Sequence, residues 1–283
     1  MLNKAYVEIT NQCNLSCAFC PKTKRAPKRM SAAEFSAVAD ALHGHVRFLY
    51  LHLMGEPLSH PELADILEAA EEKGFRICIT TNGTLLKQRG AVLLDHARTI
   101  HKVSISLHAL EGSGAAMDMQ EYLQSVWTFC EGMRQKGTYC ALRLWNEGGA
   151  EARNGEILRF IEEKIGTDPE ELPRTRSRSR VLAENLFLEM EEIFSWPDME
   201  KEETGAQFCF GLRDQVGILS DGTVVPCCLD HEGDVPLGNI FQTPFGEILE
   251  SPRAKAIYNG FSNRTPAEAL CRRCGFATRF NKG

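Results

Sequence analysis

Three cysteines near the N-terminus are the residues best suited to do chemistry. Cys13, Cys17 and Cys20 have the spacing C-x3-C-x2-C and follow a predicted strand. Thiolates at this spacing can each bind one iron of a [4Fe–4S] cube, which leaves its remaining iron open. The alternative is a structural zinc site, which needs a fourth protein ligand and fits a triplet poorly. We therefore expect a cluster with one open iron, as catalysis at a cluster requires.

A second set of cysteines lies toward the C-terminus. Its members are Cys209, Cys227, Cys271 and Cys274, of which the last two form a C-x2-C pair. By spacing alone, zinc and an iron–sulfur cluster both fit this set. Cys228 stands beside Cys227 and is an alternative ligand, so the sequence leaves that choice open. The cysteines outside both sets are expected in the core: Cys78, Cys130 and Cys140.

The elements that position the first set alternate between strands and helices. Strands are predicted over 6–10, 48–54, 76–81, 103–108, 141–146 and 186–190. Helices are predicted over 31–42, 61–73, 86–97, 119–136 and 156–165, and Ser31 with Glu34 forms a capping box at the first of them. Strands separated by helices of this length form a parallel sheet with right-handed crossovers. Residues 167–180 are predicted to form a polar loop.

Alternation along these strands separates an apolar face from a polar or aromatic one. The second face carries Tyr6, Glu8, Thr10, Tyr50, His52, Met54, Cys78, Thr80, Asn82, Ser104, Ser106, His108, Arg143 and Trp145. An open parallel sheet would be apolar on both faces, and a filled barrel core would hold branched aliphatic side chains. The pattern therefore predicts an α/β fold, a partial (β/α)6 TIM-type barrel whose lumen holds a polar ligand.

The pattern changes near residue 197. Strands over 216–219 and 223–226 are predicted to form a hairpin around Gly222, and a single helix is predicted over 245–261. The sequence thus predicts two domains. The first is the barrel over 1–197, and the second is a small β-hairpin-plus-helix domain over 198–283 that binds a cluster.

The first 150 residues or so resemble the radical S-adenosylmethionine (SAM) superfamily. The resemblance rests on the cysteine triplet with its aromatic Phe19, and on Met54-Gly55-Glu56-Pro57, Thr81-Asn82-Gly83-Thr84 and Ser106-Leu107-His108. It implies that Phe19 contacts the adenine of SAM, that the strand end at Gly55 and Glu56 holds its amino group, and that Asn82 and Ser106 contact its ribose and carboxylate. It also implies that SAM binds the open iron and is cleaved to methionine and a 5′-deoxyadenosyl radical.

The second cysteine set resembles the SPASM and shorter twitch extensions of that superfamily, with Gly222 standing five residues before Cys227. The resemblance implies one fully ligated auxiliary [4Fe–4S] cluster, which accepts an electron from the substrate radical. The expected reaction is therefore a two-electron oxidation of a small molecule or peptide. One alternative is a maturase that cross-links or oxidises peptide side chains. The alternative of another class is a non-catalytic iron–sulfur or zinc protein, an electron carrier or redox sensor.

Other charged residues are candidates for the site. A guanidinium in the lumen must be paired, and Arg143 has two candidate partners, the SAM carboxylate and Glu8. His108 stands at a strand end and is a candidate proton donor, whereas His52 is expected to be a core histidine. Glu191 follows the last predicted strand and is a candidate base.

Composition limits the class of protein. The 283 residues include 43% hydrophobic and 25% charged residues, which is ordinary for a soluble globular protein. The net charge of −6 argues against a nucleic-acid partner. The absence of a membrane-length apolar run and of a signal peptide predicts a cytoplasmic protein that does not bind a membrane. The basic run Lys22, Lys24, Arg25, Lys28 and Arg29 is either a solvated loop or a docking site for an acidic flavodoxin or ferredoxin reductant.

Overall fold

The computed structural model describes residues 2–176 and 178–281, and it is organised around one mixed sheet. The strand order in this sheet is β10-β9-β8-β1-β2-β3-β4-β5-β7-β6. The predicted barrel strands are all present and pair in parallel with their neighbours. Their bounds are β1 Lys4–Val7, β2 Phe48–Tyr50, β3 Arg76–Thr81, β4 Ile100–Ser106, β5 Tyr139–Glu147 and β7 Leu186–Glu192.

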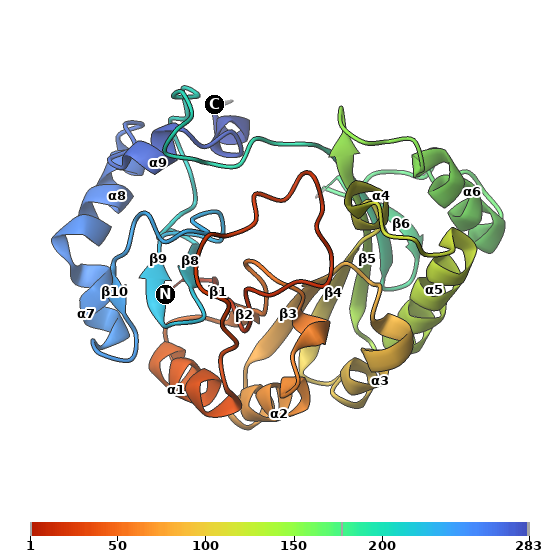
Figure 1. Ribbon diagram of the computed structural model, residues 1–283, viewed down its shortest axis with the longest axis horizontal. Helices are drawn as coiled ribbons and strands as arrows, with labels where there is room; N and C mark the ends of the chain where they lie inside the picture. Colours follow the sequence, from red (N-terminus) through yellow and green to blue (C-terminus); the bar gives the residue numbers. More distant parts are fainter. Residues whose placement is uncertain (1, 177, 282–283) are drawn as a thin grey trace.

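The predicted crossover helices are also present, and they surround the outside of the strands (Figure 1). Their bounds are α1 Ala32–Leu42, α2 Leu63–Glu72, α3 Leu86–Asp95, α5 Met119–Gln135 and α6 Asn154–Ile165. The capping box predicted at the first helix is formed, because the Ser31 hydroxyl accepts from the Glu34 N–H and the Glu34 carboxylate accepts from the Ser31 N–H. A short helix that the sequence did not indicate, α4 Ala109–Ser113, follows β4.

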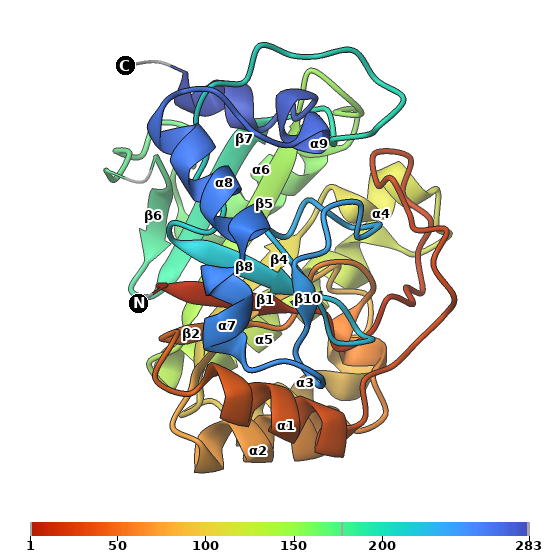
Figure 2. The ribbon, with the colours of Figure 1, turned by 90° about the vertical axis from the view of Figure 1, so that its left-hand side faces the viewer.

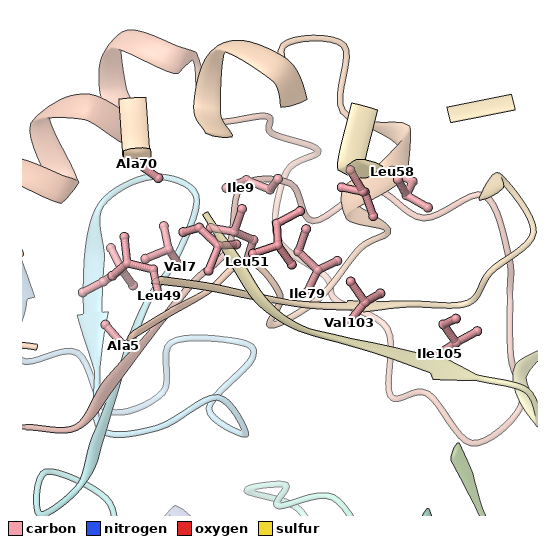
Figure 3. Close-up of a cluster of buried hydrophobic side chains, with 14 of the residues drawn as sticks. Ala5, Val7, Ile9, Leu49, Leu51, Leu58, Ala70, Ile79, Val103 and Ile105 are labelled. Atoms are coloured by element: carbon pink, nitrogen blue, oxygen red, sulfur yellow. The ribbon is translucent and has the colours of Figure 1, made fainter. Parts of the chain in front are cut away.

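The core lies between these helices and one face of the strands. Figure 3 shows Val7, Leu49, Leu51, Ile79 and Val103 from neighbouring strands gathered in this layer, and each is at most 1% exposed. These residues belong to the face predicted to be apolar. Their burial confirms the predicted apolar face, so the alternating side chains between them point to the lumen.

A strand was not predicted, and a predicted helix is wrong. The strand is β6 Arg180–Ala183, which begins at the last residue of the predicted polar loop and runs antiparallel to β7 at the sheet edge; its span is too brief for alternation to reveal. The predicted helix over 245–261 is two helices, α7 Phe245–Glu250 and α8 Pro252–Ser262. The break follows from Pro252, which lacks an N–H and opens the second helix, and from Ser251, whose hydroxyl caps it by accepting from the Ala254 N–H.

The predicted C-terminal hairpin is confirmed, and it continues the barrel sheet (Figure 2). It consists of β8 Gln215–Ile218 and β9 Thr223–Val225, and β8 pairs in parallel with β1. The remaining elements are β10 Gly238–Asn239, α9 Ala269–Arg272 and the short 3-10 turns η1 Pro57–Ser59 and η2 Ala277–Phe280. The boundary at residues 197 and 198 stays a prediction.

The loop between β1 and α1, which carries the first cysteine set, crosses the open middle of the barrel in Figure 1. Helices α7, α8 and α9 lie at the left of the same view, across the molecule from α5 and α6. Within the described part of the chain, no helix combines the length and the apolar character needed to cross a bilayer.

Candidate active site

A cavity of about 760 Å³ fills the lumen and extends to the C-terminal part of the chain. The side chains predicted to face the lumen do so along most of the strands. Those that line the cavity are Tyr6, Tyr50, His52, Thr80, Ser106, His108, Arg143 and Trp145. All of the cysteines in the second set line it too, together with Cys228. One space therefore connects the strand ends with the second cysteine set.

The first cysteine set lies in one neighbourhood. Burial raises the pKa of the Cys17 thiol to about 12, and the nearby Cys13 and Cys20 contribute to this rise. Burial also raises the pKa of Cys13, with smaller contributions from Glu56 and Cys20. Thiols that repel one another's negative charge in this way become thiolates readily only when a cation binds them. This property fits an iron cluster, for which the cysteines supply the first ligands.

The strand end at Gly55 and Glu56 braces this loop. Gly55 has φ +76°, and a Cβ at this position would lie 2.3 Å from the Thr10 carbonyl oxygen, so only glycine fits. The Glu56 carboxylate is buried and accepts from the Thr81 hydroxyl at 2.7 Å and from the Asn82 N–H at 2.8 Å. The Glu56 side chain is thus bonded within the chain, and its backbone N–H donates to the Gln12 carbonyl of the cysteine loop at 2.9 Å.

Asn82 connects the end of β3 to the cysteine loop. Its side-chain nitrogen Nδ2 lies 3.9 Å from the Cys13 sulfur and donates to the side-chain oxygen Oδ1 of Asn14 at 3.0 Å. The Tyr122 hydroxyl of α5 donates to the Asn82 backbone carbonyl at 2.8 Å. The structure therefore brings Asn82, Glu56 and the first cysteine together, as the sequence predicted for a common site.

Phe19 and His108 pack against each other at the edge of the cavity, with ring centroids 4.9 Å apart. Gly112 makes this possible, because a Cβ there would lie 2.5 Å from the Phe19 ring. Nδ1 of His108 is within hydrogen-bond distance of two backbone groups, the Arg143 carbonyl at 3.1 Å and the Trp145 N–H at 3.3 Å. Burial lowers the pKa of His108. A neutral imidazole thus has Nε2 left for a ligand.

Arg143 pairs with a residue that differs from both predicted partners. Its Nε lies 3.0 Å from a Glu189 carboxylate oxygen, its Nη1 donates to the Thr80 hydroxyl at 3.4 Å, and its guanidinium stacks on Trp145 at 4.4 Å. The proposed pairing of Arg143 with Glu8 is wrong, because Glu8 binds another arginine. The role of Arg143 toward SAM stays a prediction.

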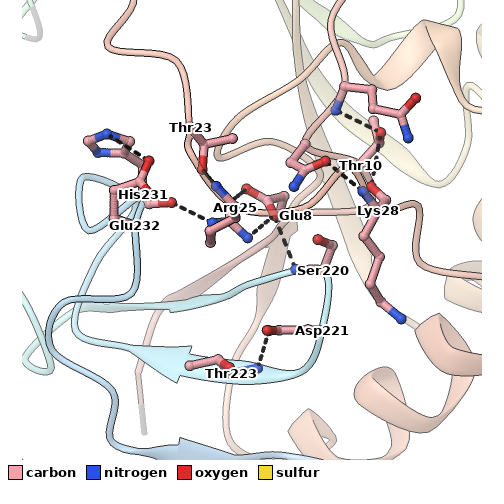
Figure 4. Close-up of polar contacts among 12 residues, drawn as sticks. Glu8, Thr10, Thr23, Arg25, Lys28, Ser220, Asp221, Thr223, His231 and Glu232 are labelled. Atoms are coloured by element: carbon pink, nitrogen blue, oxygen red, sulfur yellow. Dashed lines mark hydrogen bonds and ion pairs between the residues drawn. The ribbon is translucent and has the colours of Figure 1, made fainter.

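Glu8 is fully buried and forms a two-pronged ion pair with Arg25 of the cysteine loop (Figure 4). The guanidinium donates to both carboxylate oxygens, at 2.9 and 2.7 Å, and its Nε donates to the His231 carbonyl at 2.8 Å. The Ser220 N–H of the hairpin donates to Glu8 at 3.2 Å. Arg25 is therefore not a solvated loop residue. It fastens the cysteine loop to the C-terminal part of the chain.

Glu191 lies away from the other predicted site residues. It lines a second cavity of about 440 Å³, and its carboxylate is 3.9 Å from the Arg279 guanidinium. It is not among the residues that line the central cavity. Its role as a base therefore stays a prediction that its position does not favour.

The cysteines of the second set lie near one another in the lining of the central cavity. Burial raises the pKa of Cys227 well above its ordinary value, and Cys228, Cys209, Cys271 and Cys274 raise it further. Among the described residues, no three His, Cys, Asp or Glu side chains are grouped closely enough for a single metal ion. A [4Fe–4S] cube makes a different demand, because each thiolate binds its own iron and the ligands stand farther apart.

Cys228 has different neighbours from Cys227. Its thiol is hydrogen-bonded to the Tyr6 hydroxyl, and it packs with Tyr6 and Cys20 against a small apolar cluster that includes Leu53. Burial raises the pKa of Cys228 to about 12. Cys209 influences the pKa of both cysteines, and Cys271 and Cys274 also raise that of Cys227, so the surroundings favour Cys227 as the ligand.

Two residues of the site had little signal in the sequence. Lys102 donates to Glu189 at 2.6 Å, but the fourth strand was predicted to begin one residue later. Extending the alternation back from Ser104 would have placed Lys102 on the lumen face. Gly112 lies in α4, and only its contact with Phe19 shows why a glycine stands there.

Family models match both parts of the chain. The model of the radical SAM superfamily matches residues 7–134, and the model of the SPASM iron–sulfur cluster-binding domain matches residues 209–275. The chain belongs to the radical SAM superfamily. As a radical SAM enzyme it uses SAM with a SAM-binding [4Fe–4S] cluster, and its SPASM region implies auxiliary iron–sulfur chemistry. The non-catalytic alternative is thereby set aside.

Relatives of known name share parts of this radical SAM chain. A tungsten-containing aldehyde ferredoxin oxidoreductase cofactor-modifying protein of Pyrococcus furiosus is 34% identical over 29% of the chain. The antilisterial bacteriocin subtilosin biosynthesis protein AlbA of Bacillus subtilis is 31% identical over 96% of the chain. The chain spans 24% of the first relative's length and 65% of the second's.

Solved structures confirm the fold of this radical SAM enzyme. BtrN in complex with AdoMet and 2-DOIA has a TM-score of 0.63 at 17% identity, covering 97% of this chain and 93% of BtrN. SuiB of Streptococcus suis bound to S-adenosylmethionine has a TM-score of 0.63 at 17% identity, covering 97% of this chain and 72% of SuiB. At these identities the likeness concerns the α/β barrel architecture.

Proposed function

We propose that this radical SAM enzyme removes hydrogen from a substrate held in the central cavity and completes a two-electron oxidation. The observation that supports the proposal is the continuity of the cavity. It is lined at one edge by Phe19 and His108, beside the first cysteine loop, and at another by Cys209, Cys227 and the terminal pair. A substrate in this space would lie beside Phe19 of the first cysteine loop and beside the second cysteine set.

When bound, the first cluster would supply the electron for cleavage of SAM to methionine and a 5′-deoxyadenosyl radical, which would take a hydrogen atom from the substrate to give 5′-deoxyadenosine. The auxiliary cluster would accept the electron left on the substrate, and solvent would accept its proton. The chain's own residues hold and shield these groups. Cys13, Cys17 and Cys20 are the proposed ligands of the first cluster. Asn82 and Ser106 would orient the ribose and carboxylate of SAM, and Phe19 would cover its adenine.

Four cysteines are the proposed ligands of one auxiliary cluster, namely Cys209, Cys227, Cys271 and Cys274. Full ligation by the protein leaves no iron for substrate, so this cluster would act by electron transfer. The neighbouring polar residue Asp230 is 2% exposed and accepts backbone N–H groups of Asp234 and Val235 at 2.8 and 2.9 Å. These bonds hold the loop after Cys228 in place and engage the Asp230 carboxylate, so only the cysteine sulfurs are the proposed ligands.

A second candidate is modification of a peptide. AlbA, a protein of bacteriocin biosynthesis, is similar over nearly the whole chain, which favours this candidate. SuiB has been solved with its precursor peptide SuiA, and anSMEcpe with AdoMet and a Cp18Cys peptide. BtrN, by contrast, was solved with 2-DOIA. The two candidates share the same radical step and differ in what the cavity receives.

The reductant is proposed to be an acidic flavodoxin or ferredoxin that docks at the cysteine loop. Lys22, Lys24 and Arg29 are exposed on this loop. Arg25 and Lys28 are engaged instead, by Glu8 and by Glu34 at 2.8 Å. The three exposed cations form a positively charged docking surface next to the first cysteine set, which is smaller than the five-residue basic run predicted from the sequence.

Formation of 5′-deoxyadenosine tests the proposed function. Anaerobically reconstituted wild-type protein is incubated with SAM and dithionite, alongside the variants Cys17→Ser and Cys271→Ser. We expect the wild type and Cys271→Ser to produce 5′-deoxyadenosine and Cys17→Ser to produce none, because only Cys17 belongs to the SAM-binding cluster. A wild-type protein that carries iron and sulfide but releases no 5′-deoxyadenosine would refute the proposal.

A further inference from the structure

A row of charged side chains crosses the lumen at the level of Arg143. Glu189 accepts from Lys102 at 2.6 Å and from Arg143 at 3.0 Å, so two cations share one carboxylate. Their side chains are only 28%, 16% and 14% exposed for Lys102, Arg143 and Glu189, respectively. A surplus positive charge in a partly buried place is costly unless an anion compensates it.

The other charges around this row do not remove the surplus. Lys4, which also lines the central cavity, is paired with Asp214 at 3.7 Å. The second cavity adds one arginine, Arg178, and one carboxylate, Glu191, to its lining. Glu191 also lies 3.9 Å from Arg279, so this lining supplies no surplus negative charge, and Arg143 with Trp145 lines both cavities.

Polar nitrogens with no partner lie near Arg143. Trp145 Nε1 and His52 Nδ1 are buried, and each lacks a hydrogen-bond partner among the described residues. The Thr80 hydroxyl accepts from Arg143 at 3.4 Å and lies 3.3 Å from His52 Nε2, where the tautomer of His52 sets the direction of the bond. The guanidinium has five N–H donors, of which its bonds to Glu189 and Thr80 use two.

We propose that Arg143, stacked on the ring of Trp145, binds a carboxylate of the substrate in the lumen. The guanidinium is held by Glu189, Thr80 and the Trp145 ring, so its remaining donors are already oriented. The substrate class is therefore an organic acid, either a free carboxylic acid or an acidic residue of a peptide. This inference rests on the proposed function, because it names what the same cavity receives.

Arg143 lies beside the proposed SAM site. The residues at the first cysteine loop, Asn82 and Glu56, bond to one another and to that loop. Arg143 bonds instead to Thr80 and Glu189, and it is the register partner of Ser106 at the end of β4. A substrate carboxylate at Arg143 would therefore lie next to Ser106 and beside SAM.

The test compares an acid with its neutral amide. The probes are 3-phenylpropanoate and 3-phenylpropanamide, and the readout is the thermal unfolding midpoint of the SAM-loaded holoenzyme across a probe titration. A second arm uses an acetylated and amidated peptide with one central glutamate, and the same peptide with glutamine. The variants are Arg143→Gln, Arg143→Lys and Trp145→Phe, with Arg134→Gln as the control. Arg134 is also in an ion pair, with Glu131, but on the outer helix α5.

We expect wild type and Arg134→Gln to prefer the acid over the amide, in the free or the peptide arm according to the source of the carboxylate. Arg143→Gln should weaken acid binding by about tenfold to hundredfold, the loss typical of a hydrogen bond to a charged group, and leave amide binding unchanged. Arg143→Lys should restore part of the preference. Trp145→Phe keeps a ring for stacking and should leave the acid preference close to that of the wild type.

Equal effects of acid and amide on the wild type in both arms, including no effect of either, would overturn the inference. So would a loss of SAM binding in Arg143→Gln with the acid preference retained, since Arg143 would then belong to the SAM site. The same preparations are assayed for 5′-deoxyadenosine. If the wild type produces it while the acid preference is absent, the carboxylate site fails and the proposed function stands.

Discussion

Cys227 and Cys228 are neighbours in the chain, but they face different surroundings. Cys227 is close to the other cysteines of the second set, whereas Cys228 is bonded to Tyr6. We predict that Cys227→Ser loses the auxiliary cluster, about four irons per chain, and that Cys228→Ser keeps it. Iron and sulfide analysis of both reconstituted variants checks this. Equal iron contents in the two would contradict the assignment.

Gly55 and Gly74 form a matched pair of left-handed glycines. Both have positive φ, +76° and +72°, but only Gly55 faces a backbone oxygen where a Cβ would stand. We predict that Gly74→Ala costs about 1 kcal/mol of stability. Gly55→Ala should displace the cysteine loop and remove the first cluster while the auxiliary cluster remains. Iron content and unfolding midpoints measure both effects, and a normal first cluster in Gly55→Ala would contradict the account.

Stability should depend on pH through His52. Burial, with the charges of Arg143 and Lys4, lowers the pKa of His52 to about 3 from 6.5. The unfolded chain therefore takes up a proton below its pKa while the folded chain does not, so the stability contributed by neutral His52 is present above about pH 6.5 and is lost as the pH falls.

Between about pH 8 and about pH 6 this difference amounts to about 1 kcal/mol for the wild type. We expect His52→Gln to lose correspondingly less stability over that range, measured by denaturant unfolding at each pH. Parallel curves for the two proteins would show that His52 is not kept neutral by the fold.

The sequence predicted which side chains face the lumen. The lumen positions of His108 and Arg143 follow from alternation along a strand, a local property that the chain records directly. Their partners could not be predicted. Glu189 reaches Arg143 from a strand 46 residues away, and Arg25 reaches Glu8 through a loop fold that no periodic pattern describes.

The element that most depends on distant contacts is the loop between β1 and α1. It is held by the buried Glu8 and Arg25 pair, by the Lys24 N–H donating to Glu232 at 3.0 Å, and by the Ala18 N–H donating to the Gly112 carbonyl at 2.8 Å. The cysteine loop is therefore fastened to the hairpin on one side and to α4 on the other.

We predict that Arg25→Gln destabilises the protein by about 3 to 5 kcal/mol, because it leaves the Glu8 carboxylate buried without its cation. The double variant Glu8→Gln with Arg25→Gln should recover part of this loss. Lys28→Gln, which breaks the partly exposed pair with Glu34, is the control and should cost about 0 to 1 kcal/mol. Denaturant unfolding measures all of them, and equal losses in Arg25→Gln and Lys28→Gln would contradict the role of Arg25 as a fastener.

Helices were predictable to within a few residues where caps mark their ends, as at Ser31. The break between α7 and α8 was also encoded, in Ser251 and Pro252, but the apolar spacing continues across it and hides the stop. The pairing of β8 with β1 joins residues more than 200 positions apart. Such a pairing follows from the closure of the sheet and has no local signal.

The whole molecule is a partial barrel whose sheet is extended by its C-terminal hairpin. This arrangement places the cysteine loop over the strand ends and the second cysteine set at the same cavity. The spacing of the cysteines was enough to predict iron–sulfur clusters. The shared cavity was not predictable, because it depends on how the C-terminal part of the chain packs against the barrel. The proposed reaction depends on that shared space, because a radical formed at one centre must reach a substrate that the other can oxidise.

We propose that Cys13, Cys17 and Cys20 hold a cluster whose remaining iron binds SAM. Electron–nuclear double resonance tests this on the reduced protein, with SAM that carries magnetic isotopes at the amino nitrogen and the carboxylate oxygens. We expect both labels to couple to the cluster spin in the wild type and in Cys271→Ser. A reduced cluster that shows no coupling to either label would contradict it.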